Sequence, residues 1–190
     1  MCKLLAFSGS LRKDSFNQAI VKVVAKAAQD AGAEVKVAHL KDFIVPIFNE
    51  DDEAESGVPA KVQEFKQLMF EADGFLIATP EYNSGYSAAL KNIVDWASRK
   101  EEGESPLQAF KGKTITLMSA SPGGLGGMRG LVPTRMLFGN LGMHVHPSQQ
   151  AISSVGNLVD DSGEINDEAT IKKLQALGSQ AVDFTKLIIG

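Results

Sequence analysis

The sequence is poor in several features that would otherwise narrow its class. It has a single cysteine, Cys2, so it cannot form an internal disulfide, and such cysteine usage is typical of a reducing compartment. Its net charge of -4 at pH 7 offers no basic surface, so neither nucleic acid nor an anionic membrane is expected as a partner. No apolar run approaches the roughly 20 residues of a membrane span, and the run after Met1-Cys2-Lys3 is too short for a signal-peptide core. A cytoplasmic location is therefore expected.

The chain also lacks internal repeats and low-complexity segments, and its length is that of one domain, residues 1–190. Strand-like and helix-like patterns alternate along it. Strands are expected at 3–8, 34–40, 74–78, 114–119 and, interrupted at Pro147, 143–152, and helices at 16–31, 59–72, 88–98, 131–141 and 167–188. The acidic segment 46–57 and the segment 103–110 are expected to be loops.

Five strand–helix units predict a parallel sheet with helices on both faces, an α/β three-layer α/β/α sandwich. Because there are only five strands, the flavodoxin-like order 2-1-3-4-5 is favoured over the dinucleotide-binding order. Ligands of such sheets bind beyond the carboxyl ends of the strands, where the order reverses between strands one and three. The loops after strands one, three and four should therefore carry the functional residues.

Loop one, residues 8–17, leads from the first strand directly into a helix. Its donors are Ser10, Arg12, Ser15 and Asn17, and helix N-termini carry unsatisfied N–H groups and partial positive charge. The alternative is that Ser15, with Gln18 in a capping box, only caps the helix and that Arg12 is only a surface charge. Four donors within eight residues favour an anion site. Neither the G-x-x-x-x-G-K-[ST] pattern nor G-x-G-x-x-G is present, so a terminal phosphate is expected, not a pyrophosphate.

Loop three, residues 79–87, contains two tyrosines among small residues after Pro80, which ends the strand. Tyr82 and Tyr86 suit stacking on a flat heterocycle, and the alternative is that they contact a partner subunit. Glu81 is either a ligand contact or the ion-pair partner of an arginine, and the sequence leaves both open.

Loop four, residues 119–129, has four glycines in the five residues 123–127. Bare backbone of this kind lies flat against a ligand and directs N–H groups at ring oxygens and nitrogens. A merely flexible turn is the alternative, but its place beyond the fourth strand favours a binding role.

Together these loops resemble the NADPH-dependent FMN reductase family, which includes bacterial quinone, chromate and azo-dye reductases of flavodoxin-like fold. The matching stretches are G-S-L-R-K-D-S-F-N (9–17), P-E-Y-N (80–83) with L-K-N-I-V-D-W (90–96), and S-P-G-G-L-G-G-M-R (121–129). The resemblance covers residues 3–152. It departs from the family at one place, because many relatives have Pro-Gly before L-K-N where this chain has Ser87-Ala88.

The resemblance implies an FMN cofactor with NADPH or NADH as co-substrate. Residue by residue, it assigns the FMN phosphate to loop one and the flavin ring and ribityl chain to loops three and four. The implied cofactor-binding residues are Ser10, Arg12, Ser15, Phe16, Asn17, Pro80, Glu81, Tyr82, Asn83, Ser121, Gly123 and Gly124.

The resemblance also implies a mechanism and an assembly. NAD(P)H would pass hydride to bound FMN and leave before an acceptor arrives, which gives ping-pong kinetics, and the flavin would need no catalytic side-chain acid or base. The acceptor would be a quinone, free flavin, azo compound or metal oxyanion. A homodimer or homotetramer is implied, with helix 88–98 and loop three at the contact.

Two other functions fit a flavodoxin-like sheet. A flavodoxin-type electron-transfer protein would have no nicotinamide site, but such carriers are usually strongly acidic and have a differently built phosphate loop. A receiver-type signalling domain needs clustered carboxylates at the end of the first strand, where this chain has Ser8-Gly9-Ser10.

Several residues are not assigned a function. His144 and His146 lack a third ligand, the carboxylates of 50–55 lack the spacing of a calcium loop, and no metal site is expected. Cys2 has no paired thiol, and Trp96 is expected in the core or at a subunit interface.

Overall fold

The structure, a computed structural model, describes residues 1–190. Strands and helices alternate along the chain, and two short 3-10 helices, η1 (Leu40–Phe43) and η2 (Val155–Asn157), lie in connections. The strands are β1 (Lys3–Ser8), β2 (Glu34–His39), β3 (Gly74–Ala78), β4 (Thr114–Ala120), β5 (His144–Val145) and β6 (Gln150–Ile152). The helices are α1 (Phe16–Asp30), α2 (Glu50–Ser56), α3 (Ala60–Glu71), α4 (Ala88–Ala97), α5 (Met128–Asn140) and α6 (Glu168–Ile189).

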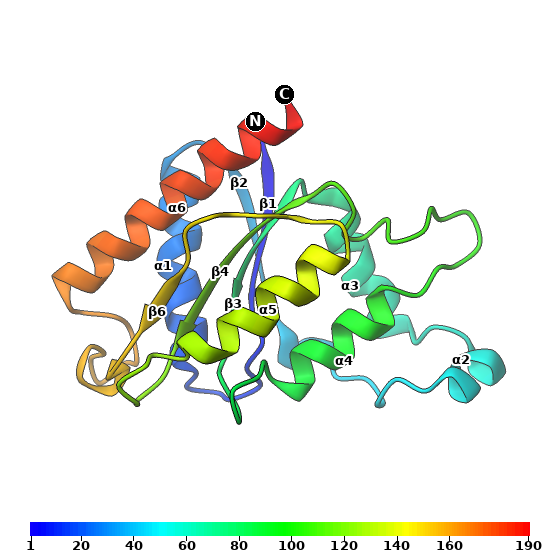
Figure 1. The fold of residues 1–190 in the computed structure, drawn as a ribbon, viewed down its shortest axis with the longest axis horizontal. Coiled ribbons are helices and arrows are strands. Elements are labelled where there is room, and N and C mark those ends of the chain that lie inside the picture. Colours follow the sequence, from blue (N-terminus) through cyan, green and yellow to red (C-terminus); the bar gives the residue numbers. More distant parts are fainter.

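The strands form one parallel sheet in the order β2-β1-β3-β4-β5, which confirms the predicted flavodoxin-like topology (Figure 1). The chain leaves β1 to one side for β2 and crosses to the other side for β3, so the order reverses between β1 and β3. Both β5 and β6 pair with β4, β5 with its first two residues and β6 with its last three. The predicted interruption of the fifth strand at Pro147 is confirmed, because Pro147 lies between β5 and β6.

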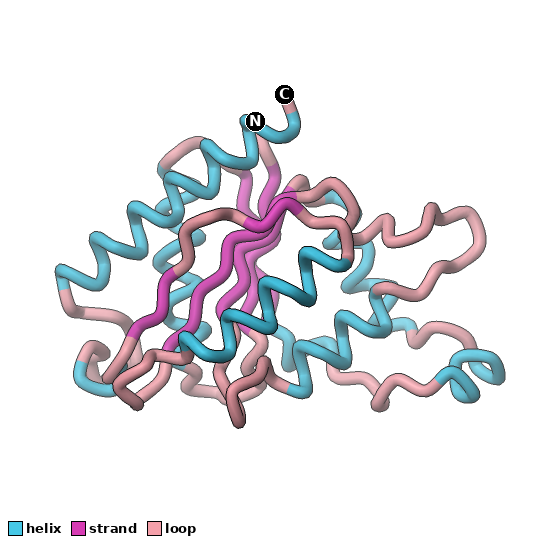
Figure 2. The backbone as a smooth tube through the Cα atoms, in the orientation of Figure 1, coloured by secondary structure: helices cyan, strands magenta, loops and turns pink.

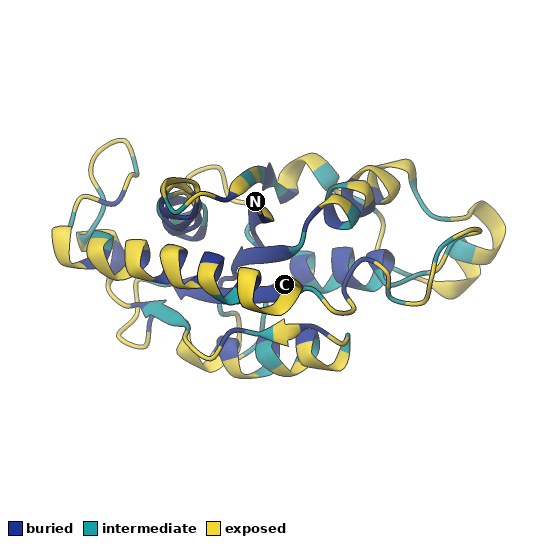
Figure 3. Cartoon of the chain, turned by 90° about the horizontal axis from the view of Figure 1, so that it is seen from above, coloured by how far each residue is buried: buried dark blue, intermediate teal, exposed yellow.

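Two layers of helices cover the sheet, and each closes a separate hydrophobic core. On one face α1 and α6 pack together over β1, β3 and β4, with Ile20, Val24 and Leu177 among the fully buried side chains. On the other face α3, α4 and α5 bury Phe65 and Trp96. The central strands β3 and β4 are buried along their whole length, and the helices expose their outer sides (Figure 3). None of the helices combines the length and apolar character needed to cross a membrane.

The register brings loops one, three and four to the same edge of the sheet. Ser8, the last residue of β1, lies opposite Ala78, the last residue of β3, and Ala78 lies opposite Met118 of β4. The three loops therefore leave the sheet side by side, along the lower edge of Figures 1 and 2.

The prediction of a loop at 46–57 is wrong, because α2 occupies Glu50–Ser56. Asn49 caps this helix by accepting a hydrogen bond from Asp51 N, and four carboxylates in its first turn favour the positive helix end. Gly57, with φ of 73°, ends it. The helix buries no residue, so it has no apolar periodicity from which it could be predicted.

The start of α5 also differs from the prediction, since the helix begins at Met128 and not at 131. Gly127 precedes it in the left-handed region, with φ of 87°, and Gly130 lies within its first turn. The helix therefore begins directly after the last glycine of loop four and includes Gly130, which a rule that treats glycine as a helix breaker misses.

Candidate functional site

The start of α1 offers unpaired donors at the end of β1. Ser15 is the N-cap, and its Oγ accepts a hydrogen bond of 3.3 Å from Gln18 N. The N–H groups of Phe16 and Asn17, the first two residues of the helix, have no hydrogen-bond partner. The Ser15 half of the predicted capping box is confirmed, but the Gln18 amide does not return to Ser15, and its Nε2 is buried without a partner.

The polar side chains of loop one keep donors free beside these N–H groups. Ser10 Oγ accepts a hydrogen bond of 3.3 Å from Arg12 N, so the Ser10 hydroxyl proton is free to be donated. The Arg12 guanidinium lies 5.5 Å from the centroid of the Phe16 ring, a cation–π distance, and forms no ion pair. Because Arg12 is exposed and has no carboxylate partner, the N–H donors of its guanidinium are available to an anion at the helix N-terminus.

Asn17 also makes a structural contact that the sequence did not indicate. It is buried, its Nδ2 donates to Ala120 O at 3.0 Å, and its Oδ1 accepts from Ala120 N at 3.0 Å. This amide pair joins the start of α1 to the last residue of β4. One Nδ2 hydrogen stays uncommitted, so Asn17 is a brace between loops one and four that keeps one donor for a ligand.

Loop three turns sharply at its exposed tip. Tyr82 and Gly85 exchange two backbone hydrogen bonds of 2.9 and 3.0 Å around Asn83 and Ser84. Both central residues lie in the left-handed region, with φ of 51° and 65°, as a type I′ turn requires. Such conformations cost about 1–3 kcal/mol for residues other than glycine and cluster at binding sites. The turn leaves Tyr82 54% exposed, whereas Tyr86 is half-buried against the core.

Glu81 is an ion-pair partner of an arginine, one of the two roles that the sequence left open. Its side chain is 8% exposed, and Oε1 accepts from Arg129 Nε at 2.8 Å and Nη2 at 2.7 Å. Its Oε2 accepts from Gly130 N at 3.2 Å. Loop three is thereby fastened to the first turn of α5, and the Glu81 carboxylate is committed to that contact.

The glycines of loop four differ in what they do. At Gly126 a Cβ would lie 2.6 Å from the Ile152 carbonyl carbon, and at Gly127 it would lie 2.8 Å from Ser119 Cβ, so both are required for close packing. Gly123 and Gly124 are exposed, and their N–H groups have no partner. Their bare backbone is free to approach a ligand, as the sequence predicts.

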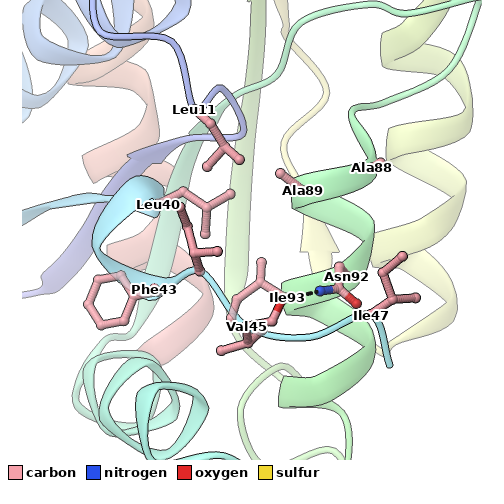
Figure 4. Close-up of a pocket in the computed structure, with 10 residues that line it drawn as sticks. Leu11, Leu40, Phe43, Val45, Ile47, Ala88, Ala89, Asn92 and Ile93 are labelled. Carbon is pink, nitrogen blue, oxygen red and sulfur yellow. Dashed lines mark hydrogen bonds between the residues drawn. The ribbon is translucent and has the colours of Figure 1, made fainter. Parts of the chain in front are cut away.

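An apolar cavity of about 200 Å³ lies beside loop one and was not foreseen (Figure 4). Leu11 of loop one, Ala89 of α4, and Ile44 and Ile47 of the segment after η1 line it. Asn92 is its one polar residue, and the amide is already used by Phe48 N and by backbone carbonyls of the same segment. The segment has no periodic pattern, so only the folded chain shows that these residues share one surface.

The residues that were not assigned a function have structural contacts. His146 is buried, its ring lies edge-on to Phe184 at 4.9 Å, and its Nδ1 contacts the Ser148 backbone. The Trp96 side chain is in the core, and its Nε1 donates to Pro46 O at 2.8 Å. Burial raises the pKa of the Cys2 thiol. No three His, Cys, Asp or Glu side chains come together as a metal site would need.

Comparison with known proteins identifies the family. The sequence model of the family described as NADPH-dependent FMN reductase matches residues 2–157. The chain belongs to this family. Among its curated relatives, an NAD(P)H-dependent FMN reductase of Pseudomonas aeruginosa is 34% identical over 174 residues, which cover 91% of this chain and 89% of that protein. The quinone reductase of Escherichia coli is 33% identical over 175 residues, with coverage of 90% and 89%.

Solved structures agree with the family assignment. The flavoenzyme NAD(P)H:(acceptor) oxidoreductase FerB of Paracoccus denitrificans superposes with a TM-score of 0.81 at 28% identity, covering 98% of both chains. An archaeal flavodoxin also superposes, with a TM-score of 0.62 at 11% identity and coverage of 97% and 99%, which shows the shared fold alone. The family match therefore favours the reductase over the flavodoxin alternative.

Proposed function

We propose that the edge formed by loops one, three and four binds FMN, with the phosphate at loop one and the ring between loops three and four. The phosphate would be held by the donors of loop one and by the start of α1, and the ring by the backbone and side chains of the two later loops. The proposed residues are Ser10, Arg12, Ser15, Phe16, Asn17, Pro80, Glu81, Tyr82, Asn83, Ser121, Gly123 and Gly124.

The observation that carries this proposal is the set of uncommitted donors at the start of α1. The N–H groups of Phe16 and Asn17 have no partner, and the guanidinium of Arg12 has no carboxylate. Donors of this kind at a helix N-terminus fit a phosphate, which supplies several acceptor oxygens and negative charge. They lie beyond the carboxyl end of β1, where the strand order reverses.

Two residues of the proposed site would act differently from what the resemblance implies. The Glu81 carboxylate is engaged by Arg129 and Gly130, so we expect its backbone, and not its side chain, to face the flavin. Asn17 would hold loop one against Ala120 and donate its remaining hydrogen to the phosphate.

As a member of this family, the chain is an FMN-dependent NAD(P)H oxidoreductase. When bound, FMN would supply the redox chemistry between NAD(P)H and an electron acceptor. The protein would bind and orient the FMN ring. The N–H groups of Gly123 and Gly124 would offer partial positive charge to the ring oxygens, and Tyr82 would offer an aromatic surface. No side chain is proposed as a general acid or base.

We propose a quinone or free flavin as the electron acceptor. The proposal is supported by relatives named quinone reductase and FMN reductase that cover most of this chain. We propose NADPH or NADH as the co-substrate, and the cytoplasmic location stays a prediction.

Anaerobic titration tests the oxidoreductase proposal. Purified protein loaded with FMN is expected to lose its visible flavin absorbance on addition of NADPH or NADH alone, and to regain it when a quinone is added. A flavodoxin-type carrier would keep its colour until a partner reductase is supplied. A protein that takes up no FMN would contradict the proposed site.

We further propose a homodimer built on α4, loop three and the apolar cavity surface beside them. Ile47 is 85% exposed and Ile44 is 66% exposed, and both line this cavity, so they form one contiguous apolar surface with it. Contiguous apolar surfaces of this kind are typical of protein–protein contacts. Sedimentation equilibrium should show a dimer or a tetramer made of two dimers, and Ile47→Asp should shift the protein toward monomer. A monomeric wild-type protein at micromolar concentration would contradict the assembly but leave the FMN site untouched.

A further inference from the structure

Ser87 uses its hydroxyl twice at the N-terminus of α4. It is 3% exposed, and its Oγ accepts a hydrogen bond of 3.1 Å from Leu90 N, which makes it the N-cap of the helix. The same hydroxyl donates to Gly9 O at 2.5 Å, across 78 residues of sequence. It therefore joins the start of α4 to the beginning of loop one.

Gly9 depends on this contact, because its carbonyl has no other hydrogen-bond partner and is buried. Its N–H donates to Ala78 O at 2.8 Å, so the peptide groups on both sides of Gly9 are fixed by separate elements. A Cβ at Gly9 would lie 3.1 Å from Leu90 Cβ and 3.2 Å from Ser87 Oγ, so the loop fits closely against α4.

The turn that follows is built on this anchored residue. Ser10 N donates to Ser8 Oγ at 3.1 Å, and Arg12 N donates to Ser10 Oγ at 3.3 Å. These two local bonds fix the turn relative to Gly9, but neither reaches another element of the fold. The Ser87–Gly9 bond, together with the bond from Gly9 N to Ala78 O, therefore fixes the position of the turn against α4 and the end of β3.

We propose that Ser87 is a positioning residue for the FMN phosphate, acting through the Gly9 carbonyl. The inference rests on the proposed phosphate site at loop one. Donors must lie within a few tenths of an ångström of the phosphate oxygens to bind well, so a loosened loop loses phosphate affinity.

The test compares two ligands that differ only in the phosphate, FMN and riboflavin. Dissociation constants of both are measured on the flavin-free protein by quenching of flavin fluorescence. In Ser87→Ala we expect the FMN constant to rise about five- to tenfold, the scale of one hydrogen bond, and the riboflavin constant to change less than about twofold.

Ser87→Pro removes the hydroxyl with little backbone change. The φ of −67° suits proline, and Ser87 N donates no hydrogen bond in the structure. It should lower the preference for FMN over riboflavin as Ser87→Ala does. Ser87→Cys, which is close in size and a weak donor, is the variant of choice if the others unfold.

A matched control is Thr185→Ala, which removes a buried hydroxyl contact of 2.7 Å to Thr114 Oγ1 at the start of β4, the edge of the sheet opposite loop one. It should lower the melting temperature and leave the ratio of the two constants unchanged. If folded Ser87 variants keep the wild-type ratio, or lose both ligands equally, Ser87 is only a helix cap and the inference is overturned. If wild-type protein itself does not prefer FMN to riboflavin, the phosphate site proposed above fails as well.

Discussion

Replacing Arg12 with alanine removes the one guanidinium of loop one. Arg12 is exposed, has no carboxylate partner and lies 5.5 Å from the Phe16 ring, so its loss disrupts no ion pair within the protein. The substitution removes the proposed charge-assisted contact between the Arg12 guanidinium and the FMN phosphate. Such hydrogen bonds contribute about 1.5–3 kcal/mol, so Arg12→Ala should raise the FMN dissociation constant about 10- to 150-fold.

Fluorescence titration of the flavin-free variant with FMN and with riboflavin measures this effect. The riboflavin constant should hardly move, because that ligand has no phosphate. Lys13→Ala removes the same charge from the neighbouring residue, and we expect it to weaken FMN binding less than about threefold at 0.15 M salt, where exposed charges are screened. Equal losses in Arg12→Ala and Lys13→Ala would show a general electrostatic effect, and an unchanged FMN constant in Arg12→Ala would place the phosphate elsewhere.

Three further changes test other parts of the account. Tyr82→Ala should shift the visible absorption bands of bound flavin more than it changes the FMN-to-riboflavin affinity ratio, because the exposed ring is proposed to face the flavin and not the phosphate. Gly126→Ala puts a methyl group 2.6 Å from the β6 backbone at a φ of 62°, so urea denaturation should show a loss of about 2 kcal/mol or more, whereas Gly124→Ala, with no atom within 4 Å, should cost less than about 0.5 kcal/mol. Lys66→Met removes a buried ammonium that donates to Glu104 at 2.6 Å, and it should cost about 3 kcal/mol at pH 7. Burial raises the pKa of Glu104, but the hydrogen bonds from Lys66 and from the backbone outweigh it, so the net pKa lies below the ordinary 4.5. The contribution of the Lys66–Glu104 pair to the free energy of unfolding is therefore present above pH 4.5 and is lost as the pH falls through the folded-state pKa of Glu104. The difference in unfolding free energy between wild type and Lys66→Met should shrink in acid, and a constant difference would contradict this account.

The sheet order and the site's location follow from local patterns in the sequence. The apolar runs of β1, β3 and β4 are fully buried strands, and their alternation with helical patterns leaves few possible topologies. Glycine, serine and arginine after the first strand, and glycines after the fourth, then indicate which edge binds the ligand. Both predictions depend on residues close together in the chain.

The contacts that join the loops could not be read from the sequence. The Asn17–Ala120 pair spans 103 residues, and the Glu81–Arg129 pair spans 48. Asn17 and Glu81 are polar residues whose partners depend on how β3 and β4 are placed, so a single sequence leaves a ligand and a neighbouring loop as equal possibilities. The apolar cavity was missed for the same reason, since it joins Leu11 to a segment without periodicity.

A crystal structure of the protein soaked with FMN tests the central claim most directly. The account predicts phosphate density within hydrogen-bond distance of the Phe16 and Asn17 N–H groups and of the Arg12 guanidinium, with the ring between loops three and four. Phosphate density at any other edge of the sheet, with the start of α1 left empty, would contradict it.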